Sequence, residues 1–435
     1  MKRNRIIALA IAIVMCLPSI AFANSQELNG NGALVNSNPD ESVKAAISKN
    51  LLLSVGTVTP NTTFLFHAKG ISVDGDISQE VVAGMPDLTK NLKVSFSEAL
   101  TGTPDGNNIV SIIRETEDIF DGITFDEPGV YVYEITELPE TTTGIEENEP
   151  YESLTFSKAV YTISVYVAWN SDRTATVIYG VGTRVNVPDV SGEQVQDKKI
   201  DATPGGDGDR YDHSQLIFTN TYVKTNAPID PENPDFATES TLYVSKLVTG
   251  NMGLLTQYFD FEIELTVPAI IENKPAFYRA YIVENNVVVN PSENAAGSPM
   301  GTDAVGTYIE ISTLGVTKFK LKDGQRLAFI DTPVGTGYIA KEELVEGYIQ
   351  TVQVTTNAIA GDIIPVVDDN PLSTGPQLVG EKLNRAAFTN NRDSAAPMGI
   401  DLNNLPFIGL ILLTIVGLIG FVVVKSRRRR YAVEK

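Results

Sequence analysis

The chain has 435 residues, of which 43% are hydrophobic, and this composition excludes a disordered protein. Its formal net charge of -21 argues against a nucleic acid as a binding partner, because like charges repel. The only cysteine is Cys16, so a mature form of this chain that begins after residue 16 has no disulfide bond.

The N-terminus has the features of a secretory signal peptide over residues 1–23. Basic residues precede an apolar run from Ile6 to Ile20, and Ala21-Phe22-Ala23 supplies the small residues of a cleavage site. Lipid attachment at Cys16 is an alternative. Residues 24–42 are rich in Asn, Gly and Ser and are predicted to form a flexible leader. We therefore expect the rest of the chain to be extracellular.

Residues 43–223 are predicted to form a first β-sandwich. Its first strand, Ala46 to Leu51, alternates apolar and polar residues, and turn signals such as Asp74-Gly75 separate the later runs. Many short strands with few helical stretches are typical of a sandwich. A strand from Val130 to Glu137 ends in an acid, and the last strand contains Ile217-Phe218-Thr219-Asn220.

A second predicted sandwich, residues 239–393, repeats this plan after a proline-spaced linker at 224–238. Its first strand is Tyr243 to Val248, a later strand from Gly337 to Glu342 again ends in an acid, and Ala387-Phe388-Thr389-Asn390 closes it. Each unit thus has a lysine in its first strand, a glutamate in a middle strand and an asparagine in its last. This order occurs twice.

The C-terminus combines an apolar segment with a basic tail. Residues 405–424 are long enough to span a bilayer, and the tail 425–435 has four consecutive arginines, which are expected to stay cytoplasmic. A single-pass anchor is one interpretation. The other is the sorting signal of a Gram-positive surface protein, which a sortase transpeptidase cuts just before the span. In the corresponding region, 394–404, Pro397-Met398-Gly399 has Met398 in place of the usual threonine, so both interpretations stay open.

Five short stretches of the first predicted sandwich and four of the second are distinctive. The stretches are Ile47-Ser48-Lys49-Asn50-Leu51, Thr59 to Phe64, Gly129 to Tyr133, Ala168-Trp169-Asn170 and Phe218-Thr219-Asn220, then Lys246 to Gly250, Leu321 to Gly324, Pro333-Val334-Gly335 and Phe388-Thr389-Asn390. Through these stretches the chain resembles the streptococcal-type major pilins of Gram-positive bacteria, and the resemblance covers nearly all of the mature chain. The resemblance implies an all-β fold of two tandem immunoglobulin-like sandwiches of the CnaB or pilin type.

In such pilins the first-strand lysine and the last-strand asparagine form an intramolecular isopeptide bond, assisted by the glutamate. The resemblance therefore implies two bonds with their assisting acids: Lys49 with Asn220 and Glu137, and Lys246 with Asn390 and Glu342. Glu343 and Asn391 leave a one-residue ambiguity in the second set. The alternative interpretation for either set is that the lysine lies on the surface of an edge strand, the glutamate is a charge at a strand end, and the asparagine is a turn residue.

The chemistry of this reaction explains the residue types. Burial disfavours charge, so it lowers the pKa of a lysine, which then attacks as the neutral amine, and raises the pKa of a glutamate. The protonated glutamate is expected to donate a hydrogen bond to the asparagine carbonyl and later to assist the departure of ammonia. Contact between amine and amide supplies an effective molarity on the order of 10⁵ M or more. The reaction happens once in each sandwich, so the protein is not expected to be an enzyme.

The resemblance implies a structural subunit of a surface pilus, polymerised or anchored to the cell wall by a sortase. Its partners would be the sortase, other pilin subunits and peptidoglycan, and its place the cell surface after an initial membrane-anchored stage. Polymerisation needs an acceptor lysine, for which Lys198 or Lys199 is suitably placed, unless the pair is only a solvated loop. The alternative function is a minor pilin or wall-anchored adhesin that binds a host or surface ligand.

No cofactor or metal is expected. His67 and His213 do not make a zinc site without cysteine, and no phosphate-binding or serine-hydrolase pattern occurs. The acidic stretch Asp207 to Asp212 has oxygen ligands that suit calcium, but it lacks the spacing of a calcium-binding loop.

Overall fold

The computed structural model describes residues 26–28, 33–36, 38–139, 145, 152–189, 194–205, 212–225, 242–367, 370–393, 410–419, 421 and 425. Strands are by far the commonest regular element among these residues, and the all-β fold class predicted from the sequence is confirmed. The strands divide into two pairs of sheets, each pair enclosing its own hydrophobic core. We refer to these as the N-terminal and the C-terminal sandwich.

The N-terminal sandwich contains twelve strands and two short helical turns among its described residues. They are β1 (Gln26–Leu28), β2 (Ala33–Asn36), β3 (Ser48–Ser54), β4 (Thr62–Val73), α2 (Gln79–Ala83), η1 (Thr89–Asn91), β5 (Lys93–Phe96), β6 (Ile109–Glu115), β7 (Gly129–Glu137), β8 (Glu152–Thr155), β9 (Val160–Trp169), β10 (Thr176–Val187), β11 (Lys199–Ile200) and β12 (Ile217–Lys224). One sheet has the order β1-β2-β10-β9-β7-β4-β5, with β11 also on β10, and the other has the order β6-β3-β12-β8.

The C-terminal sandwich follows the same principle with a larger sheet. Its strands are β13 (Leu242–Thr249), β14 (Phe259–Thr266), β15 (Phe277–Glu284), β16 (Val287–Val288), β17 (Met300–Thr302), β18 (Thr307–Ser312), β19 (Thr317–Leu321), β20 (Gln325–Phe329), β21 (Gly337–Glu342), β22 (Ile349–Thr356), β23 (Ile359–Pro365), β24 (Leu372–Ser373), β25 (Gln377–Leu378) and β26 (Asn384–Asn391). The order is β17-β18-β15-β20-β13-β26-β22-β23 in one sheet, with β16 on β15, and β19-β14-β21-β24 in the other, with β25 on β21.

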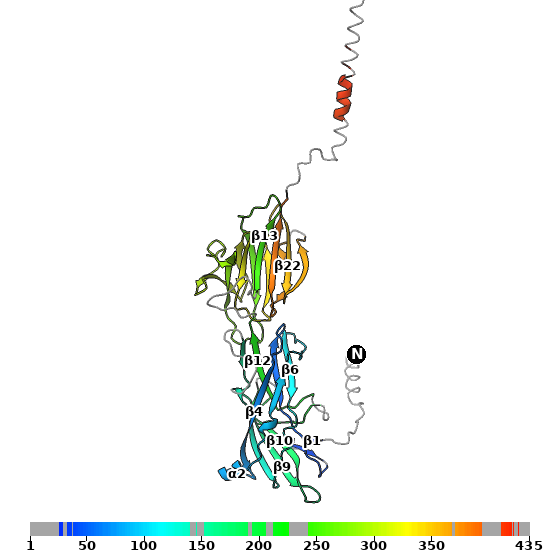
Figure 1. Ribbon diagram of the computed structural model, residues 1–435, viewed down its shortest axis with the longest axis vertical. Coiled ribbons are helices and arrows are strands. Elements are labelled where there is room, and N and C mark those ends of the chain that lie inside the picture. Colours follow the sequence, from blue (N-terminus) through cyan, green and yellow to red (C-terminus); the bar gives the residue numbers. More distant parts are fainter. Residues whose placement is uncertain are drawn as a thin grey trace, which may run out of the picture.

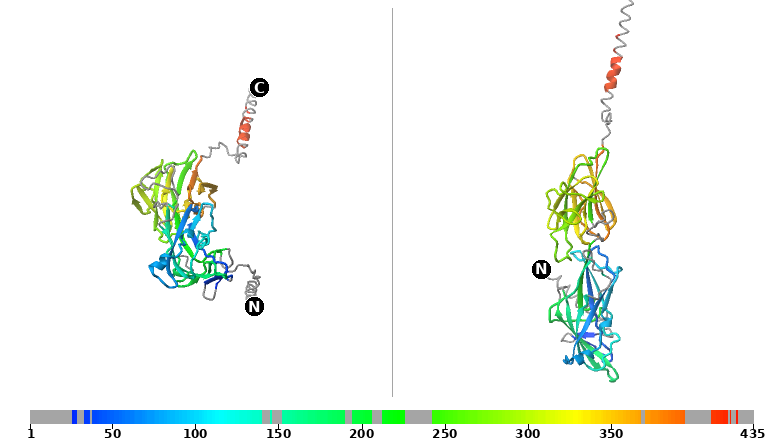
Figure 2. Two further views of the ribbon diagram at one scale, coloured as in Figure 1. Left: turned by 60° about the horizontal axis from the view of Figure 1, so that its bottom comes forward. Right: turned by 60° about the vertical axis from the view of Figure 1, so that its left-hand side comes forward.

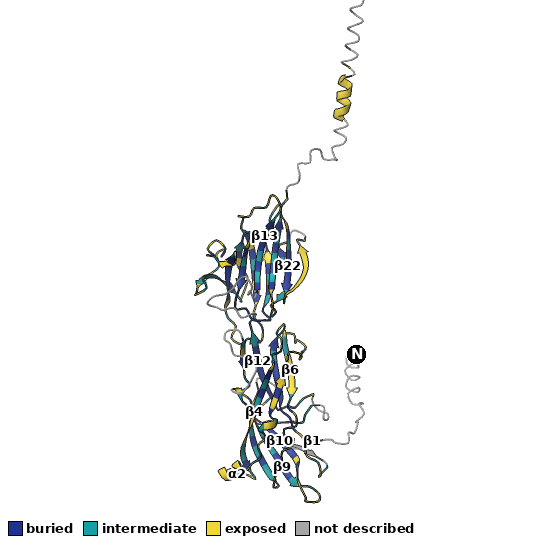
Figure 3. Cartoon of the chain, in the orientation of Figure 1, coloured by how far each residue is buried: buried dark blue, intermediate teal, exposed yellow. Residues whose placement is uncertain are grey.

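Side chains alternate between the core and the outer face of each sheet, as the period of two of a β-strand requires. In β7 and β9 every second residue is buried, and the same holds for β14. Buried residues are concentrated in the strands of both sandwiches, whereas β23, the edge strand beside β22, is exposed along its whole length (Figure 3). The two cores are therefore built by the inner faces of the sheets.

The first and last long strands of each sandwich lie side by side and run parallel. β3 pairs with β12, and β13 pairs with β26, while every other pairing between described strands is antiparallel. Parallel neighbours enter a sandwich at one end and leave it at the other. Each sandwich thus receives the chain at one end of its long axis and releases it at the opposite end.

The two sandwiches lie end to end (Figures 1 and 2). At their junction the Glu381 carboxylate accepts a hydrogen bond from the Val58 N–H, over 2.7 Å, and lies 3.3 Å from the Lys224 Nζ. The Val334 N–H donates to the Lys224 carbonyl over 2.8 Å. Contacts from both strands and loops therefore join the last strand of the first sandwich to the second.

Several sequence predictions concern residues outside the described ones. The signal peptide 1–23, leader residues 24, 25, 29–32 and 37, linker residues 226–238 and the whole sorting region 394–404, with Pro397, Met398 and Gly399, all belong to this group. The prediction that 24–42 is a flexible leader is wrong for β1 and β2, because these strands pair with each other and β2 also pairs with β10. Residues 410–419 form a helix, but in the part of the chain that is described no helix is long and apolar enough to cross a membrane. Of the predicted span, 405–409, 420 and 422–424 lie outside the described residues. The domain boundaries stay predictions.

Candidate functional site

Lys49, Glu137 and Asn220 meet in the core of the N-terminal sandwich. The Lys49 Nζ lies 2.6 Å from the Glu137 Oε1, and the Asn220 Nδ2 donates to the same oxygen over 2.8 Å. Lys49 and Asn220 are completely buried, and Glu137 is 7% exposed. The lysine and the asparagine come from the neighbouring strands β3 and β12, and the glutamate comes from β7 in the facing sheet.

Lys246, Glu342 and Asn390 form the same arrangement in the C-terminal sandwich. The Lys246 Nζ lies 2.6 Å from the Glu342 Oε1, to which the Asn390 Nδ2 donates over 2.7 Å. All three residues are buried. Glu343 is exposed and Asn391 is bonded to the Thr249 hydroxyl, so the geometry selects Glu342 and Asn390 from the adjacent candidates.

Strand register explains why the two clusters match. In the parallel pairs, Lys49 lies opposite Phe218 and Lys246 lies opposite Phe388, so each asparagine follows two residues later on the same face. In the facing sheets, Phe66 pairs with Glu137 and Phe261 pairs with Glu342. The two sandwiches therefore place the same three groups at the same register positions.

Two phenylalanines surround each lysine amine. The Lys49 Nζ lies 4.6 Å from the ring centroid of Phe64 and 5.9 Å from that of Phe66. The Lys246 Nζ lies 4.3 Å from Phe259 and 5.9 Å from Phe261. These rings exclude water from the amine and contact it with their faces. The Phe-x-Phe pattern is present in both sequence repeats, but its role did not follow from the sequence alone.

Burial changes the protonation of each pair. Loss of hydration lowers the pKa of Lys49 to about 8, against the attraction of Glu137, and lowers that of Lys246 to about 8 against Glu342. Burial raises the pKa of Glu137 and of Glu342, and the adjacent lysine opposes this rise. Both shifts favour the neutral pair, an amine beside a carboxylic acid. The neutral amine is the nucleophilic form.

The asparagine amide has a definite orientation in the N-terminal cluster. Its nitrogen faces Glu137, while its Oδ1 accepts a hydrogen bond of 2.7 Å from the Ser157 N–H. The glutamate therefore contacts the nitrogen of the amide, whereas the sequence-based mechanism places it on the carbonyl oxygen. In the C-terminal cluster the Asn390 Oδ1 and the Glu342 Oε2 have no hydrogen-bond partner among the described residues.

The remaining predicted site residues lie elsewhere. Lys199 is on β11, at the edge of β10, and Lys198 precedes it in a turn; both are exposed and neither contacts a cluster. Their role as acceptors stays a prediction. Within the described residues, no three His, Cys, Asp or Glu side chains lie close enough together to hold a metal ion.

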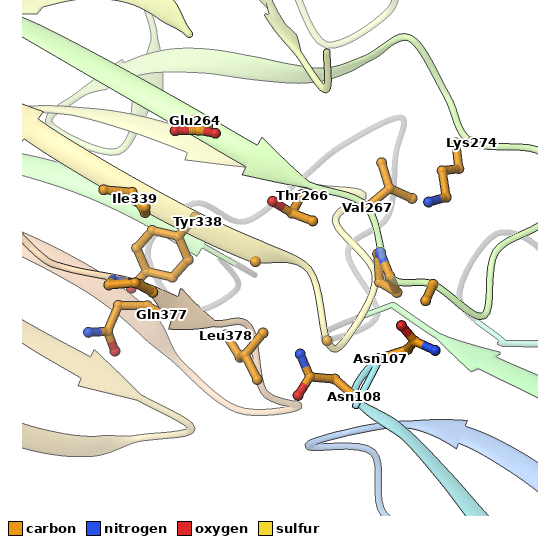
Figure 4. A pocket seen from close by; sticks show the side chains of 15 residues that line it. Asn107, Asn108, Glu264, Thr266, Val267, Lys274, Tyr338, Ile339, Gln377 and Leu378 are labelled. Carbon is orange, nitrogen blue, oxygen red and sulfur yellow. The ribbon is translucent and has the colours of Figure 1, made fainter. Parts of the chain in front are cut away.

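A cavity of about 740 Å³ lies between the two sandwiches, away from both clusters. Asn107 and Asn108 contribute to it from the N-terminal sandwich, and Thr266, Tyr338 and Leu378 from the other (Figure 4). The charged lining residues, Glu264 and Lys274, lie at separate edges of the cavity in this view. The cavity thus lacks convergent catalytic groups, and the buried clusters are the stronger candidate site.

Comparison with known proteins finds a pilin among the relatives of this chain. Over 390 residues the chain is 24% identical to a pilin from Streptococcus pyogenes serotype M1, a match that covers 88% of this chain and 91% of that protein. The chain is similar to a streptococcal pilin over most of its length. This confirms the resemblance inferred from the sequence. Residues 240–392 also match a family described as "Domain of unknown function (DUF7601)".

Among solved structures, the major pilin from Streptococcus pyogenes matches with 20% sequence identity, over 81% of this chain and 100% of that one, at a TM-score of 0.31. A pilus-presented adhesin matches with 17% identity, over 54% of this chain and 37% of that one, at a TM-score of 0.21. TM-scores this low do not establish a shared arrangement of the whole chain, so the sequence similarity is the informative result.

Proposed function

We propose that this protein is a structural subunit of a surface pilus, polymerised or wall-anchored by a sortase. Its two sandwiches are then pilin-type immunoglobulin-like domains, each locked by an autocatalytic isopeptide bond, Lys49 to Asn220 and Lys246 to Asn390. The observation that carries the proposal is the buried cluster that occurs in both sandwiches. In each cluster one carboxyl oxygen contacts both the lysine of the first strand and the asparagine of the last strand. The similarity to a streptococcal pilin supports the same role.

The geometry supports a simple exchange of amine for amide nitrogen. The neutral Lys49 Nζ attacks the Asn220 Cγ, and a new C–N bond forms. The bond from Cγ to Nδ2 then breaks, and ammonia leaves. Glu137, which contacts both nitrogens through Oε1, gives its proton to the leaving nitrogen and takes one from the attacking amine. Glu342 performs the same transfers between Lys246 and Asn390, and each carboxylic acid is restored at the end.

The bonds replace a kind of cross-link that this chain cannot make. Its single cysteine lies within the predicted signal peptide, so an extracellular form has no disulfide to connect the strands that enter and leave a sandwich. Strand-to-strand hydrogen bonds alone yield when a sheet is pulled apart. A covalent bond between β3 and β12, and another between β13 and β26, would hold both entry and exit strands.

The mass of the intact protein tests the bonds directly. Recombinant residues 24–393 are expected to weigh less than their sequence by two molecules of ammonia, because each isopeptide bond releases one. Lys49→Ala or Asn220→Ala should restore one ammonia, and Lys246→Ala or Asn390→Ala the other. Lys93→Ala, which removes an exposed lysine of the N-terminal sandwich, is the matched control and should leave both losses in place.

The glutamate variants sharpen this measurement. Glu137→Ala or Glu342→Ala keeps the amine and the amide in contact but removes the group that moves protons between them. The corresponding loss of ammonia should be slow or absent, and the other sandwich should be unaffected. A wild-type chain with its full sequence mass would refute the isopeptide proposal, and complete bonding in a glutamate variant would refute that residue's role.

Polymerisation distinguishes a shaft subunit from the alternative, a minor pilin or wall-anchored adhesin. On the cells that produce it, a shaft subunit is expected to give a ladder of high-mass covalent species in denaturing gels, lost when the sortase is deleted. If Lys198 or Lys199 is the acceptor, Lys198→Ala with Lys199→Ala should abolish the ladder and leave the monomer mass unchanged. A single wall-anchored species in the wild type would favour the adhesin.

A further inference from the structure

Ser157 is a fourth member of the N-terminal cluster that has no counterpart in the C-terminal one. It lies in the connection between β8 and β9 and is 8% exposed. Its N–H donates to the Asn220 Oδ1 over 2.7 Å and lies 3.2 Å from the Glu137 Oε2. The equivalent oxygens of Asn390 and Glu342 have no partner among the described residues. The two clusters thus share their reacting groups but differ at the carbonyl oxygen.

Asp189 accepts a hydrogen bond from the Ser157 side chain. The Ser157 hydroxyl donates to the Asp189 Oδ1 over 2.6 Å, and Asp189 itself is only 4% exposed. The Asp189 Oδ2 has no hydrogen-bond partner among the described residues. A buried carboxyl group with an unpaired oxygen is costly to a fold, so its presence beside the cluster calls for a reason. Its hydrogen bond to Ser157 is the contact that links it to the reacting amide.

We propose that the Ser157 main-chain N–H is the donor that activates the Asn220 carbonyl for attack, and that Asp189 is the positioning residue that keeps this N–H in place. The inference rests on the proposed isopeptide reaction and adds a catalytic group to its N-terminal half. As Lys49 attacks, the carbonyl double bond opens and negative charge develops on the Asn220 Oδ1. The donor of an oxyanion hole must point at this oxygen, as the Ser157 N–H does.

The same N–H selects the reactive orientation of the amide. A main-chain N–H can only donate, so it requires the oxygen of Asn220 on its side and thereby directs the Nδ2 to Glu137. When the charged intermediate collapses, the carbonyl re-forms and the Cγ–Nδ2 bond breaks. The leaving nitrogen then already contacts the acid that protonates it, and it departs as ammonia. In the C-terminal cluster the described residues supply no such selection.

The experiment measures the two bonds separately in one molecule. Residues 24–393 are produced by cell-free translation, and samples are quenched in denaturant at intervals. Peptide mass mapping then gives the ammonia lost from each sandwich over time. Asp189→Ala and Ser157→Ala should each slow the N-terminal bond by about tenfold to a hundredfold, because a displaced N–H no longer meets the developing charge. The C-terminal bond is the internal control and should keep its rate.

Two further variants separate positioning from a general structural effect. Asp189→Asn retains an oxygen that accepts the Ser157 hydroxyl and should restore a rate near that of the wild type. Asp189→Ala combined with Ser157→Ala should be no slower than either alone, because both remove one linkage. Ser153→Ala, an exposed position on β8, is the matched control and should change neither bond.

The possible failures are distinguishable. An N-terminal bond that forms at the wild-type rate in Asp189→Ala would overturn this inference, as would an Asp189→Asn variant as slow as Asp189→Ala. A double variant much slower than both single ones would overturn the single linkage between Asp189 and Ser157. If the wild type loses no ammonia from either sandwich, the isopeptide proposal itself fails, and this inference fails with it.

Discussion

Asn220→Ala is expected to lower the unfolding free energy of the N-terminal sandwich by about 5 kcal/mol, the loop-entropy estimate for removing a cross-link that closes so long a loop. This substitution removes the bond but keeps the buried pair of Lys49 and Glu137 intact. Trp169, the only tryptophan, lies at the end of β9, so its fluorescence reports the unfolding of this sandwich in denaturant. The denaturant concentration at the unfolding midpoint should fall sharply relative to the wild type. The dependence of the unfolding free energy on denaturant concentration should be steeper, because the unfolded chain without the cross-link is more expanded.

Lys49→Ala is the informative comparison, because it removes the bond and also removes the amine that is hydrogen-bonded to the buried Glu137 carboxyl. A buried carboxyl that loses its partner costs stability, so this variant should unfold at a lower denaturant concentration than Asn220→Ala. Asn390→Ala is the matched control, since it opens the other sandwich and should leave the Trp169 transition nearly unchanged. Equal midpoints for the wild type and Asn220→Ala would show that the cross-link does not stabilise this sandwich.

The repeated parts of the site could be predicted from the sequence. Lysine, glutamate and asparagine occur in the same order in two strand patterns, and the period of two assigns each to a face of its strand. The structure places Glu342 opposite Phe261 on the inner face, while Glu343, one residue further, points outward. Strand period thus explains the choice between adjacent acids that the motif alone left open.

Other parts could not be predicted, because their signal is neither repeated nor local. Ser157 and Asp189 belong to no pattern that repeats in the second sandwich. They lie outside the strands and are separated along the chain by β9 and β10. Only the folded chain brings them to Asn220. The phenylalanine pairs are different, since they do repeat, but an apolar residue on a strand looks the same whether it fills a core or surrounds an amine.

The parallel pairing of first and last strands determines how force would pass through the molecule. Tension applied at the two ends of a sandwich enters along β3 or β13 and leaves along β12 or β26. Without a cross-link this geometry loads the hydrogen bonds between the strands in shear. With the proposed bonds, the path runs from Lys49 directly to Asn220 and from Lys246 directly to Asn390. The residues between each pair are then outside the path.

Single-molecule pulling between residues 43 and 393 should therefore give almost no unfolding extension in the wild type. Lys49→Ala should release the N-terminal sandwich with a gain of roughly 600 Å, and Lys246→Ala the C-terminal one with roughly 500 Å, from the maximum reach of an extended residue. The two steps differ in length, so each identifies its own sandwich, and the double variant should show both. Lys93→Ala, which removes a lysine outside the clusters, should behave like the wild type. If the wild type extends as far as the double variant, the bonds do not lie in the path of the force, and the proposed shaft would have to gain its strength from contacts between subunits instead.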